Sequence, residues 1–377
     1  MSIVKEEDVN VSEVPITGHE KYMDHEVVYR IESQEHGITA FVGVHNTALG
    51  PGLGGIRYKH YESEDAALTD VLRLSEAMTW KNAAGGLEFG GGKTVLLAPK
   101  GSNRAEKEAL EVLSLGLNKI NKPQPMYHGA EDMNINEEAL NYMIKITPWI
   151  NGATSNDPNI VGGTPSPLTA IGVFECMKVA ARHKLGKDSL KGLRITMQGL
   201  GSVGSALAKH LHNEGAILSG ADISDAPFEA LEAEGVTVER VGLDEIYDTP
   251  ADIFAPNAIG GTLTNKTVEC LQNAGVQIVC GAANNQQEDQ ITFVQSKLMH
   301  DLGLLYCPDY IVNAGGVIWV AKVGENAEQT TEDIRTGVPR RFQDVLDLQS
   351  QNPDKDMATI AAEYSRKRVE TASKQTA

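Results

Sequence analysis

The sequence has little cysteine, few aromatic residues and a deficit of basic charge. Its four cysteines, Cys176, Cys270, Cys280 and Cys307, form no C-x-x-C pair. Their spacing does not indicate a zinc site and instead favours reduced core thiols of a cytosolic protein. Lys and Arg number 33 against 51 Asp and Glu, which gives a formal charge of −18. This balance disfavours a nucleic-acid or anionic-membrane partner, because both bind basic surfaces.

Long apolar runs and targeting features are also missing. No uninterrupted apolar stretch reaches the ~18 residues of a membrane span. The N-terminal segment MSIVKEEDVNVSE is acidic and polar, unlike a secretory signal or an Arg-rich transit peptide, so we expect a cytoplasmic protein. With 41% hydrophobic and 22% charged residues the composition is that of a globular protein. At ~150 residues per domain, the length favours two domains.

The chain changes character near residue 150. Residues 27–61 alternate apolar and polar side chains, as short strands do. Ser63 is placed to cap a helix whose apolar residues keep helical spacing, and a second helix is expected over 104–119. The stretch 150–166 is rich in Gly, Pro, Asn and Ser without periodicity, which is typical of a linker.

After this stretch, strand-like and helix-like segments alternate. Ser166, as an N-cap followed by Pro167, predicts a helix that runs to about His183. Apolar strands are expected near 193–198, 216–222, 252–256, 277–280 and 303–307. The alternation predicts a parallel, doubly wound sheet. The tail from about residue 326 predicts two polar helices joined near Pro353.

A G-x-G-x-x-G motif spans Gly199–Gly204. Alone it is weak evidence, because a chain with 37 glycines produces such a motif by chance. Here a strand precedes it, a helix that stops at Gly215 follows, and the next strand ends on Asp222. This is the dinucleotide-binding arrangement, in which an acidic residue binds the ribose hydroxyls. Asp222 would repel a 2′-phosphate, which predicts NAD over NADP. The alternative is a tight turn with a surface aspartate.

Three evenly spaced asparagines, Asn257, Asn285 and Asn313, each follow an expected strand. Ligands of doubly wound sheets bind beyond the carboxyl ends of the strands, so these residues are candidates to line one crevice. For Asn257 the alternative is that asparagine is simply common in turns.

Lys81 and Lys93 are the candidates for chemistry in the first half. The run before Lys93 looks like a P-loop, but Leu87 stands where that motif needs glycine, and a strand follows instead of a helix. Lys81 lies beside the buried face of its helix, where a lysine is costly unless it meets an anion. The nearby glycines would let the backbone approach a small anionic substrate. The alternative is that both lysines are exposed surface charges.

Seven segments share a pattern with a known family. They are GPGLGGIR (50–57), MTWKNAAGGLEFGGGKT (78–94), AEDM (130–133), TPSPLTA (164–170), QGLGSVG (198–204), DIFAPNAIGG (252–261) and PDYIVNAGGV (308–317). In this order and spacing they resemble the Glu/Leu/Phe/Val amino-acid dehydrogenases, with the leucine dehydrogenases most similar. The resemblance runs from about residue 25 to 325.

The resemblance implies oxidative deamination of an L-amino acid to a 2-oxo acid and ammonium, with NAD accepting the hydride. It implies an α/β protein of two domains with catalysis between them. These are a mixed α/β substrate domain over 1–152, with helices 326–377 packed back on it, and a Rossmann-type NAD domain over 153–325. It also implies a homo-oligomer. The implied chemistry needs no metal, and the ten histidines offer no ligand cluster.

Carried over by position, the resemblance also implies residue roles. Lys93 would activate water and polarise the carbonyl or imine, Asp132 would carry the amino-group proton, and Lys81 would bind the substrate carboxylate. Burial and the like charge of Lys81 would lower the pKa of Lys93. Further substrate contacts would be Leu53, Gly54, Gly55, Met78, Ala130, Asn285, Val317 and Val320. Cofactor contacts would be Thr169, Gly199, Leu200, Gly201, Ser202, Val203, Gly204, Asp222, Ile223, Asn257, Ala258, Ala283 and Asn285.

The expected substrate is an apolar amino acid, most of all leucine or another branched-chain one. Leu53 matches the lysine with which glutamate-specific members pair the second carboxylate, and burying a carboxylate without a partner costs several kcal/mol. The alternative within the family is a phenylalanine or tryptophan dehydrogenase. The alternative from another class is a non-catalytic NAD-binding protein on this fold, against which Lys81, Lys93 and Asp132 argue.

Overall fold

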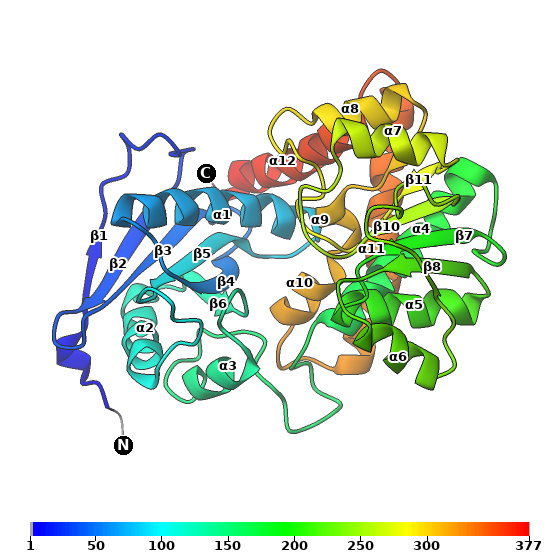
Figure 1. Cartoon of the computed structure of the whole chain (residues 1–377). Helices are drawn as coiled ribbons and strands as arrows, with labels where there is room; N and C mark the ends of the chain where they lie inside the picture. Colours follow the sequence, from blue (N-terminus) through cyan, green and yellow to red (C-terminus); the bar gives the residue numbers. More distant parts are fainter. Residues whose placement is uncertain (1–2, 377) are drawn as a thin grey trace. The chain divides into compact units, whose positions relative to one another are not determined.

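The computed structural model describes residues 3–376, which form two compact units (Figure 1). Unit 1 consists of Met1–Thr164, Val320–Ala327 and Ser365–Ala377, and unit 2 of Pro165–Trp319 and Glu328–Tyr364. This division differs from the expected one, which cut the chain at 152/153 and kept all of 326–377 with the first domain. Most of the C-terminal tail contributes to the compact packing of unit 2 instead.

Unit 1 is built on a mixed sheet in the order β1-β2-β3-β5-β4-β6. The strands are β1 Asn10–Glu13, β2 Val27–Ser33, β3 Ile38–Asn46, β4 Gly52–Lys59, β5 Gly90–Leu97 and β6 Tyr127–Ala130. β4 runs parallel to both β5 and β6, whereas β1, β2, β3 and β5 pair antiparallel. The strands expected within 27–61 are therefore confirmed as β2, β3 and β4.

Helices cover both faces of this sheet. They are α1 Glu64–Ala84, α2 Lys107–Ile120 and α3 Glu137–Met143 (Figure 1). As predicted, Ser63 caps α1, and its Oγ accepts a hydrogen bond from the N–H of Ala66 at 3.1 Å. On one face, buried residues of α1 such as Val71 pack against Val95 of β5. On the other face, α2 packs into a larger core that includes Ile56 of β4.

Unit 2 is built on a parallel sheet in the order β12-β11-β10-β7-β8-β9. The strands are β7 Arg194–Gln198, β8 Ile217–Ala221, β9 Glu239–Arg240, β10 Ile253–Pro256, β11 Ile278–Val279 and β12 Leu305–Tyr306. Counted from β7, this is the 3-2-1-4-5-6 order of the Rossmann fold, so the predicted doubly wound sheet is confirmed. β9 was not expected, because its two exposed charged residues carry no apolar signal.

The helices after residue 165 flank this sheet and form the tail. They are α4 Ser166–Leu185, α5 Ser202–Glu214, α6 Ala226–Ala233, α7 Asn265–Asn273, α8 Val294–Asp301, α9 Asp309–Val312, α10 Gly315–Ala321, α11 Ala327–Gln351 and α12 Met357–Thr376. The two expected tail helices are confirmed as α11 and α12. The N-cap of α4 is Pro165, not Ser166 as predicted, because the Pro165 carbonyl accepts the N–H of Thr169.

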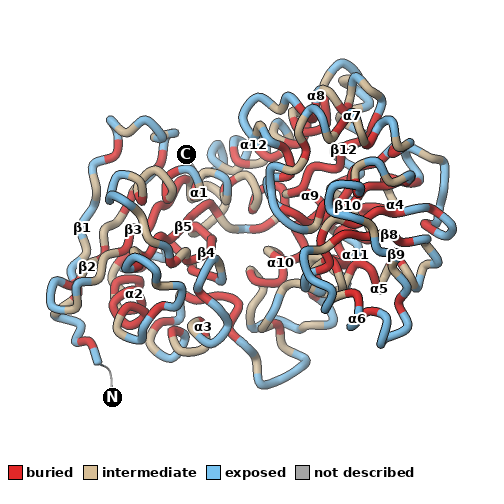
Figure 2. The backbone as a smooth tube through the Cα atoms, in the orientation of Figure 1, coloured by how far each residue is buried: buried red, intermediate tan, exposed pale blue. Residues whose placement is uncertain are grey.

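Burial is concentrated on the sheets and on the helix faces turned toward them (Figure 2). The four cysteines are unpaired, and three of them, Cys176, Cys280 and Cys307, are buried. Among the described helices, none combines the length and apolarity needed to cross a membrane.

Candidate active site

The strand register of unit 1 brings the predicted catalytic groups together. The β4–β5 register places Gly55 opposite Lys93, and Gly55 also pairs with Ala130 of β6. Side chains of residues opposite each other on neighbouring strands share one face. Asp132 follows Ala130 by two positions, so it returns to the same face. Lys93, on β5, and Asp132, on the loop after β6, therefore meet over β4, which lies between these two strands.

Lys93 and Asp132 form an ion pair, with the lysine Nζ 2.9 Å from Oδ2 and the side chains 7% and 26% exposed. Burial lowers the pKa of Lys93 and outweighs the opposing carboxylate. Burial alone would raise the pKa of Asp132, but the charges of Lys93 and Arg57 outweigh it, so this pKa lies below its usual value. The pair thus combines an ionised carboxylate with a lysine that gives up its proton readily, which suits proton transfer.

Gly55 leaves the space in which these two side chains meet. A Cβ at this position would lie 2.6 Å from the Cβ of Asp132 and 3.0 Å from the Nζ of Lys93. At Gly54, a Cβ would overlap the carbonyl oxygen of Gly92, so close contact between β4 and β5 requires glycine there. The structure gives both glycines a packing reason, and their contact with substrate stays a prediction.

Protein atoms also account for the glycines before Lys93. A Cβ on Gly91 would overlap Thr79 of α1, and one on Gly92 would lie 2.5 Å from the ring of Tyr127. These positions were expected to let the backbone approach a small anion. The side chains that β5 must accommodate are instead those of α1 and β6.

Arg57 is a charged residue of this site that the sequence analysis missed. Its Nε donates to Oδ2 of Asp132 at 2.9 Å, and its NH1 donates to Oδ2 of Asp70 at 3.1 Å. Arg57 is a like charge that adds to burial in lowering the pKa of Lys93, and the contribution expected from Lys81 stays a prediction. The available signal was its position two residues after Gly55, on the same face of β4.

The residues predicted to contact the substrate side chain belong to both units. Leu53 and Ala130 are buried on β4 and β6 of unit 1. Val320, also assigned to unit 1, is buried on α10, and its carbonyl oxygen accepts a hydrogen bond from Asn151. Val317 is half-buried in unit 2.

Lys81 and Met78 lie on the last two turns of α1, and both are half-buried. The Met78 Cγ would lie 3.2 Å from a Cβ on Gly54, which puts this side chain beside the β4 glycines. Met78 therefore lies beside β4, and Lys81 follows it by three residues on the same helix. Their contact with a substrate remains a prediction.

The glycine motif of unit 2 connects β7 to α5, as predicted. Gly199 has φ +91°, a conformation that favours glycine. A Cβ on Gly204 would overlap the Gly199 carbonyl, so this glycine lets α5 pack against the loop. Gly201 caps α5, and it and Ser202 are exposed. An exposed helix N-terminus after a glycine turn is suited to a pyrophosphate, so these residues fit a dinucleotide.

Asp222 follows β8 directly and is tied to the glycine loop. Its Oδ2 accepts the N–H of Leu200 at 2.7 Å, and its Oδ1 accepts the N–H of Ser224 at 3.0 Å. The next residue, Ile223, is 92% exposed. The carboxylate is therefore held beside the loop where a ribose is expected.

The three asparagines after the strands divide into two kinds. Oδ1 of Asn257 accepts the N–H of Ala282, and Nδ2 of the buried Asn313 donates to the carbonyl of the same residue. Both therefore support the loop after β11. Asn285, at the end of that loop, is exposed and has φ +54°. Of the three, Asn285 is the one whose exposure suits a ligand contact.

The remaining predicted cofactor residues also lie in unit 2. Ala258 is exposed after β10, and Ala283 is buried, with its N–H bonded to the carbonyl of Pro256. Val203, half-buried, lies in the first turn of α5. The Oγ1 of Thr169 on α4 donates to the carbonyl of Pro165 at 3.1 Å. Their contacts with a cofactor remain predictions.

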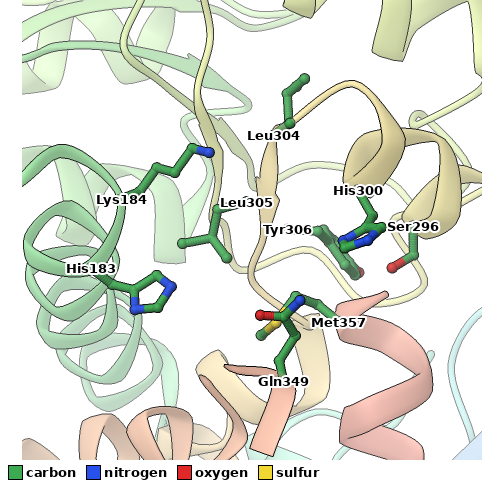
Figure 3. Close-up of a pocket in the computed structure, with 10 residues that line it drawn as sticks. His183, Lys184, Ser296, His300, Leu304, Leu305, Tyr306, Gln349 and Met357 are labelled. Atoms are coloured by element: carbon green, nitrogen blue, oxygen red, sulfur yellow. The ribbon is translucent and has the colours of Figure 1, made fainter. Parts of the chain in front are cut away.

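A hollow of about 230 Å³ lies elsewhere in unit 2, with His183, His300 and Gln349 among its lining residues (Figure 3). It opens where Leu304 leads into β12, at the amino-terminal end of that strand. The glycine loop follows the carboxyl end of β7. In a parallel sheet the carboxyl ends of all strands lie on the side opposite to their amino-terminal ends. The hollow is therefore separate from the dinucleotide loop.

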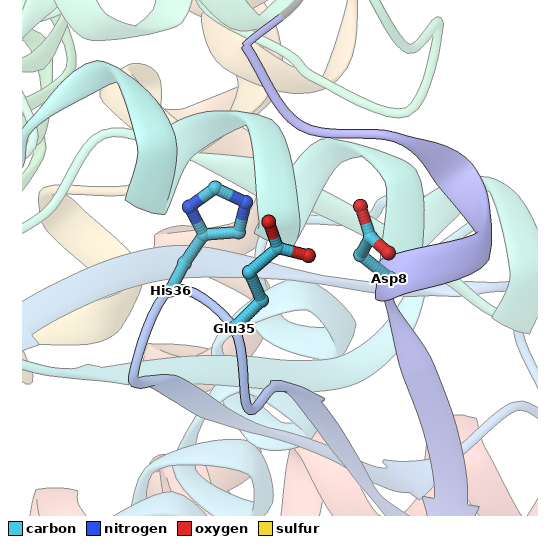
Figure 4. A group of neighbouring side chains, drawn as sticks. All are labelled: Asp8, Glu35 and His36. Carbon is cyan, nitrogen blue, oxygen red and sulfur yellow. The ribbon is translucent and has the colours of Figure 1, made fainter.

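A cluster of metal-ligand type lies on the surface of unit 1. Asp8, in the short 3-10 helix Glu6–Asp8, and Glu35 and His36, in the β2–β3 turn, place their ligand atoms within 4.8 Å of one another (Figure 4). Exposed carboxylates often gather without an ion, and the cluster shares no residue with the Lys93 site.

Known protein families match most of the chain. Residues 19–148 match the Glu/Leu/Phe/Val dehydrogenase dimerisation domain, and residues 228–377 match the glutamate/leucine/phenylalanine/valine dehydrogenase domain. The chain is 40% identical over 320 residues to leucine dehydrogenase from Thermoactinomyces intermedius. The aligned region covers 84% of this chain and 83% of the relative. It is 36% identical over 319 residues to phenylalanine dehydrogenase from Lysinibacillus sphaericus, covering 82% and 80%.

Solved structures match as well. The crystal structure of L-tryptophan dehydrogenase from Nostoc punctiforme has a TM-score of 0.78 and 29% identity, and covers 93% of this chain and 97% of that one. A hetero-hexameric glutamate dehydrogenase from Thermus thermophilus, at 20% identity and a TM-score of 0.71, covers 98% and 89% and shares the fold.

Proposed function

Because the chain belongs to the glutamate, leucine, phenylalanine and valine dehydrogenase family, and is thus an amino-acid dehydrogenase, we propose that it oxidises a branched-chain L-amino acid, preferably leucine, with NAD. The products are the 2-oxo acid, ammonium and NADH. The observation that carries the proposal is the ion pair of Lys93 and Asp132, formed on the same sheet whose strands β4 and β6 carry the buried Leu53 and Ala130.

The proposed chemistry assigns one task to each charged group. Lys81 binds the substrate carboxylate. Asp132 takes a proton from the amino group and later returns one to the departing ammonia. Lys93 takes a proton from the water that adds to the imine carbon, for which its lowered pKa is suited. Bound NAD supplies the acceptor for the hydride that leaves the α-carbon.

Asp222 supports NAD over NADP in this proposal. Two backbone N–H groups hold its carboxylate beside the glycine loop, where it would accept hydrogen bonds from ribose hydroxyls and repel a 2′-phosphate. Arg240 on β9 pairs with Asp225 at 2.6 Å, so its charge is already engaged by a carboxylate.

Leu53 and Ala130 support an apolar substrate. An isobutyl group buried against such side chains gains about 1.5–3 kcal/mol. A buried carboxylate without a partner would cost several kcal/mol, which disfavours glutamate. We further propose that the chain works as a homo-oligomer, since residues 19–148 match a dimerisation domain, and that it needs neither nucleic acid nor membrane.

A substrate panel tests this function. L-Leu, L-Ile, L-Val, L-Phe, L-Trp and L-Glu are each assayed with NAD and with NADP by the absorbance of the reduced cofactor, and Lys93→Ala provides the blank. We expect the highest kcat/KM with L-leucine and NAD. A higher value with L-phenylalanine or L-tryptophan would reassign the substrate, and no turnover with any amino acid would favour a non-catalytic NAD-binding protein.

A further inference from the structure

We infer that Arg57, held in place by Asp70, is a positioning residue for the Lys93–Asp132 pair. The inference rests on the proposed function of that pair and adds two residues to which it gives no role. Arg57 lies on β4 and Asp70 on α1, so the contact joins the sheet to the helix that covers it.

Arg57 bridges two carboxylates. Its Nε lies 2.9 Å from Oδ2 of Asp132, and its NH1 lies 3.1 Å from Oδ2 of Asp70. The side chains of Arg57 and Asp70 are 17% and 12% exposed. An ion pair with this little exposure is poorly screened by solvent, so its geometry matters more than that of a surface pair.

Asp70 is itself fixed by further donors. The hydroxyl of Tyr61 donates to Oδ2 at 2.6 Å, and NH2 of Arg73 donates to Oδ1 at 2.8 Å. Burial would raise the pKa of Asp70, but these donors and Arg57 outweigh it and lower the pKa. Asp70 therefore stays charged at neutral pH and is held by Tyr61 and α1 while it holds Arg57.

Arg57 keeps the Asp132 carboxylate paired with a positive charge while Lys93 is neutral. When Lys93 gives up its proton, Asp132 loses a positive partner in a site that is largely shielded from water, which is costly for a carboxylate. Arg57 does not deprotonate, so it keeps Asp132 paired throughout the cycle. Both cations contact Oδ2, which leaves Oδ1 to receive the substrate amino group.

The same groups set the proton affinity of Lys93 from three sides. Asp132, on the loop after β6, and Asp70, on α1, favour the ammonium form, whereas Arg57, on β4, disfavours it. Removing Arg57 should therefore raise the pKa of Lys93, and neutralising Asp70 should lower it. A residue that only stabilised the fold would not produce shifts of opposite sign.

The test is the pH profile of kcat/KM for L-leucine oxidation in Arg57→Gln and Asp70→Asn. We expect the limb that reports Lys93 deprotonation to move up by roughly 1 pH unit in the first variant and down in the second. Arg57→Lys should restore part of the wild-type profile. Arg30→Gln is the matched control, because Arg30 likewise bridges a strand carboxylate, Glu32, and an α1 carboxylate, Glu64. This variant should leave the pH profile unchanged.

A second measurement covers variants that turn over too slowly. The pH dependence of Lys93 acylation by acetic anhydride, followed by peptide mass spectrometry, reports the same pKa without catalysis. Unshifted profiles in both variants, with thermal stability lost only as in Arg30→Gln, would overturn the inference. If the wild type oxidised no amino acid, the proposed function would fail, while the acylation profiles would still decide the role of Arg57.

Discussion

Lys93 occupies a position where a lysine is rarely tolerated. Its side chain is 7% exposed and lies on a strand packed beneath α1, yet its ammonium is matched by the Asp132 carboxylate. The glycine opposite, Gly55, is what makes room for that match. Three residue choices are therefore interdependent: a cation on β5, an anion on the loop after β6, and the absence of a side chain on β4 between them.

Gly55→Ala should strongly impair catalysis. The added Cβ would lie 2.6 Å from the Cβ of Asp132 and 3.0 Å from the Nζ of Lys93, so the pair must move apart. Misplacing catalytic groups by about 1 Å typically costs ~10²-fold in rate. The measurement is kcat/KM for L-leucine, with Gly18→Ala as control because a Cβ on Gly18 meets nothing within 4 Å. Equal activity of the two variants would show that the spacing over β4 is unimportant.

Asp222→Ala should weaken the preference for NAD. The variant loses a carboxylate that is fixed at the end of β8 by the N–H groups of Leu200 and Ser224. We expect the ratio of kcat/KM for NAD to that for NADP to fall by at least ~10-fold, mainly through a poorer KM for NAD, since a hydrogen bond to a charged group contributes about 1.5–3 kcal/mol. A wild-type enzyme that used both cofactors equally well would argue against this role for Asp222.

The contact between β3 and α1 depends on a neutral histidine. His45 is a residue of β3, with Nε2 donating to the carbonyl of Met23 at 2.9 Å and Nδ1 2.7 Å from the hydroxyl of Thr79 on α1. Burial, helped by the nearby His25, lowers the pKa of His45 to about 4. This packing positions α1, and α1 carries Asp70, Met78 and Lys81.

Unit 1 should therefore lose stability between pH 6.5 and 4. In that window the unfolded chain binds a proton on His45 and the folded chain does not, so each pH unit costs up to 1.36 kcal/mol, or about 3 kcal/mol in total. Above pH 6.5 the contribution is complete. Urea unfolding at several pH values, followed by tryptophan fluorescence, measures it. His45→Asn should flatten this dependence, and an equally steep loss in that variant would assign the effect to other groups.

The fold of unit 2 could be predicted from the sequence more fully than that of unit 1. In unit 2 the signals are local: a strand, the Gly199–Gly204 motif, a helix that ends at Gly215 and an aspartate follow one another directly, and the structure keeps that order. In unit 1, β5 inserts between β3 and β4, and β4 pairs with β6 across a long stretch of chain. No local pattern encodes this register, so the contact of Arg57 with Asp132 was not foreseen.

The resemblance in sequence pointed to Lys93 and Asp132, whereas the register explains why they meet. The same limit applies to the glycines before Lys93. Their number was visible in the sequence, but their cause, close packing against Thr79 and Tyr127, is a tertiary fact. Ser166 is an example of a local signal that misleads. Serine is a common N-cap residue, but the N-cap of α4 is the preceding residue, Pro165.

The most direct test of this account replaces Lys93 with alanine and measures the turnover of L-leucine with NAD, alongside NAD binding and thermal stability. If Lys93 acts as the general acid–base group, kcat should fall by ~10²–10⁴-fold. NAD binding should stay near the wild-type value, because the glycine loop and Asp222 belong to unit 2. A Lys93→Ala enzyme with wild-type turnover would contradict the account.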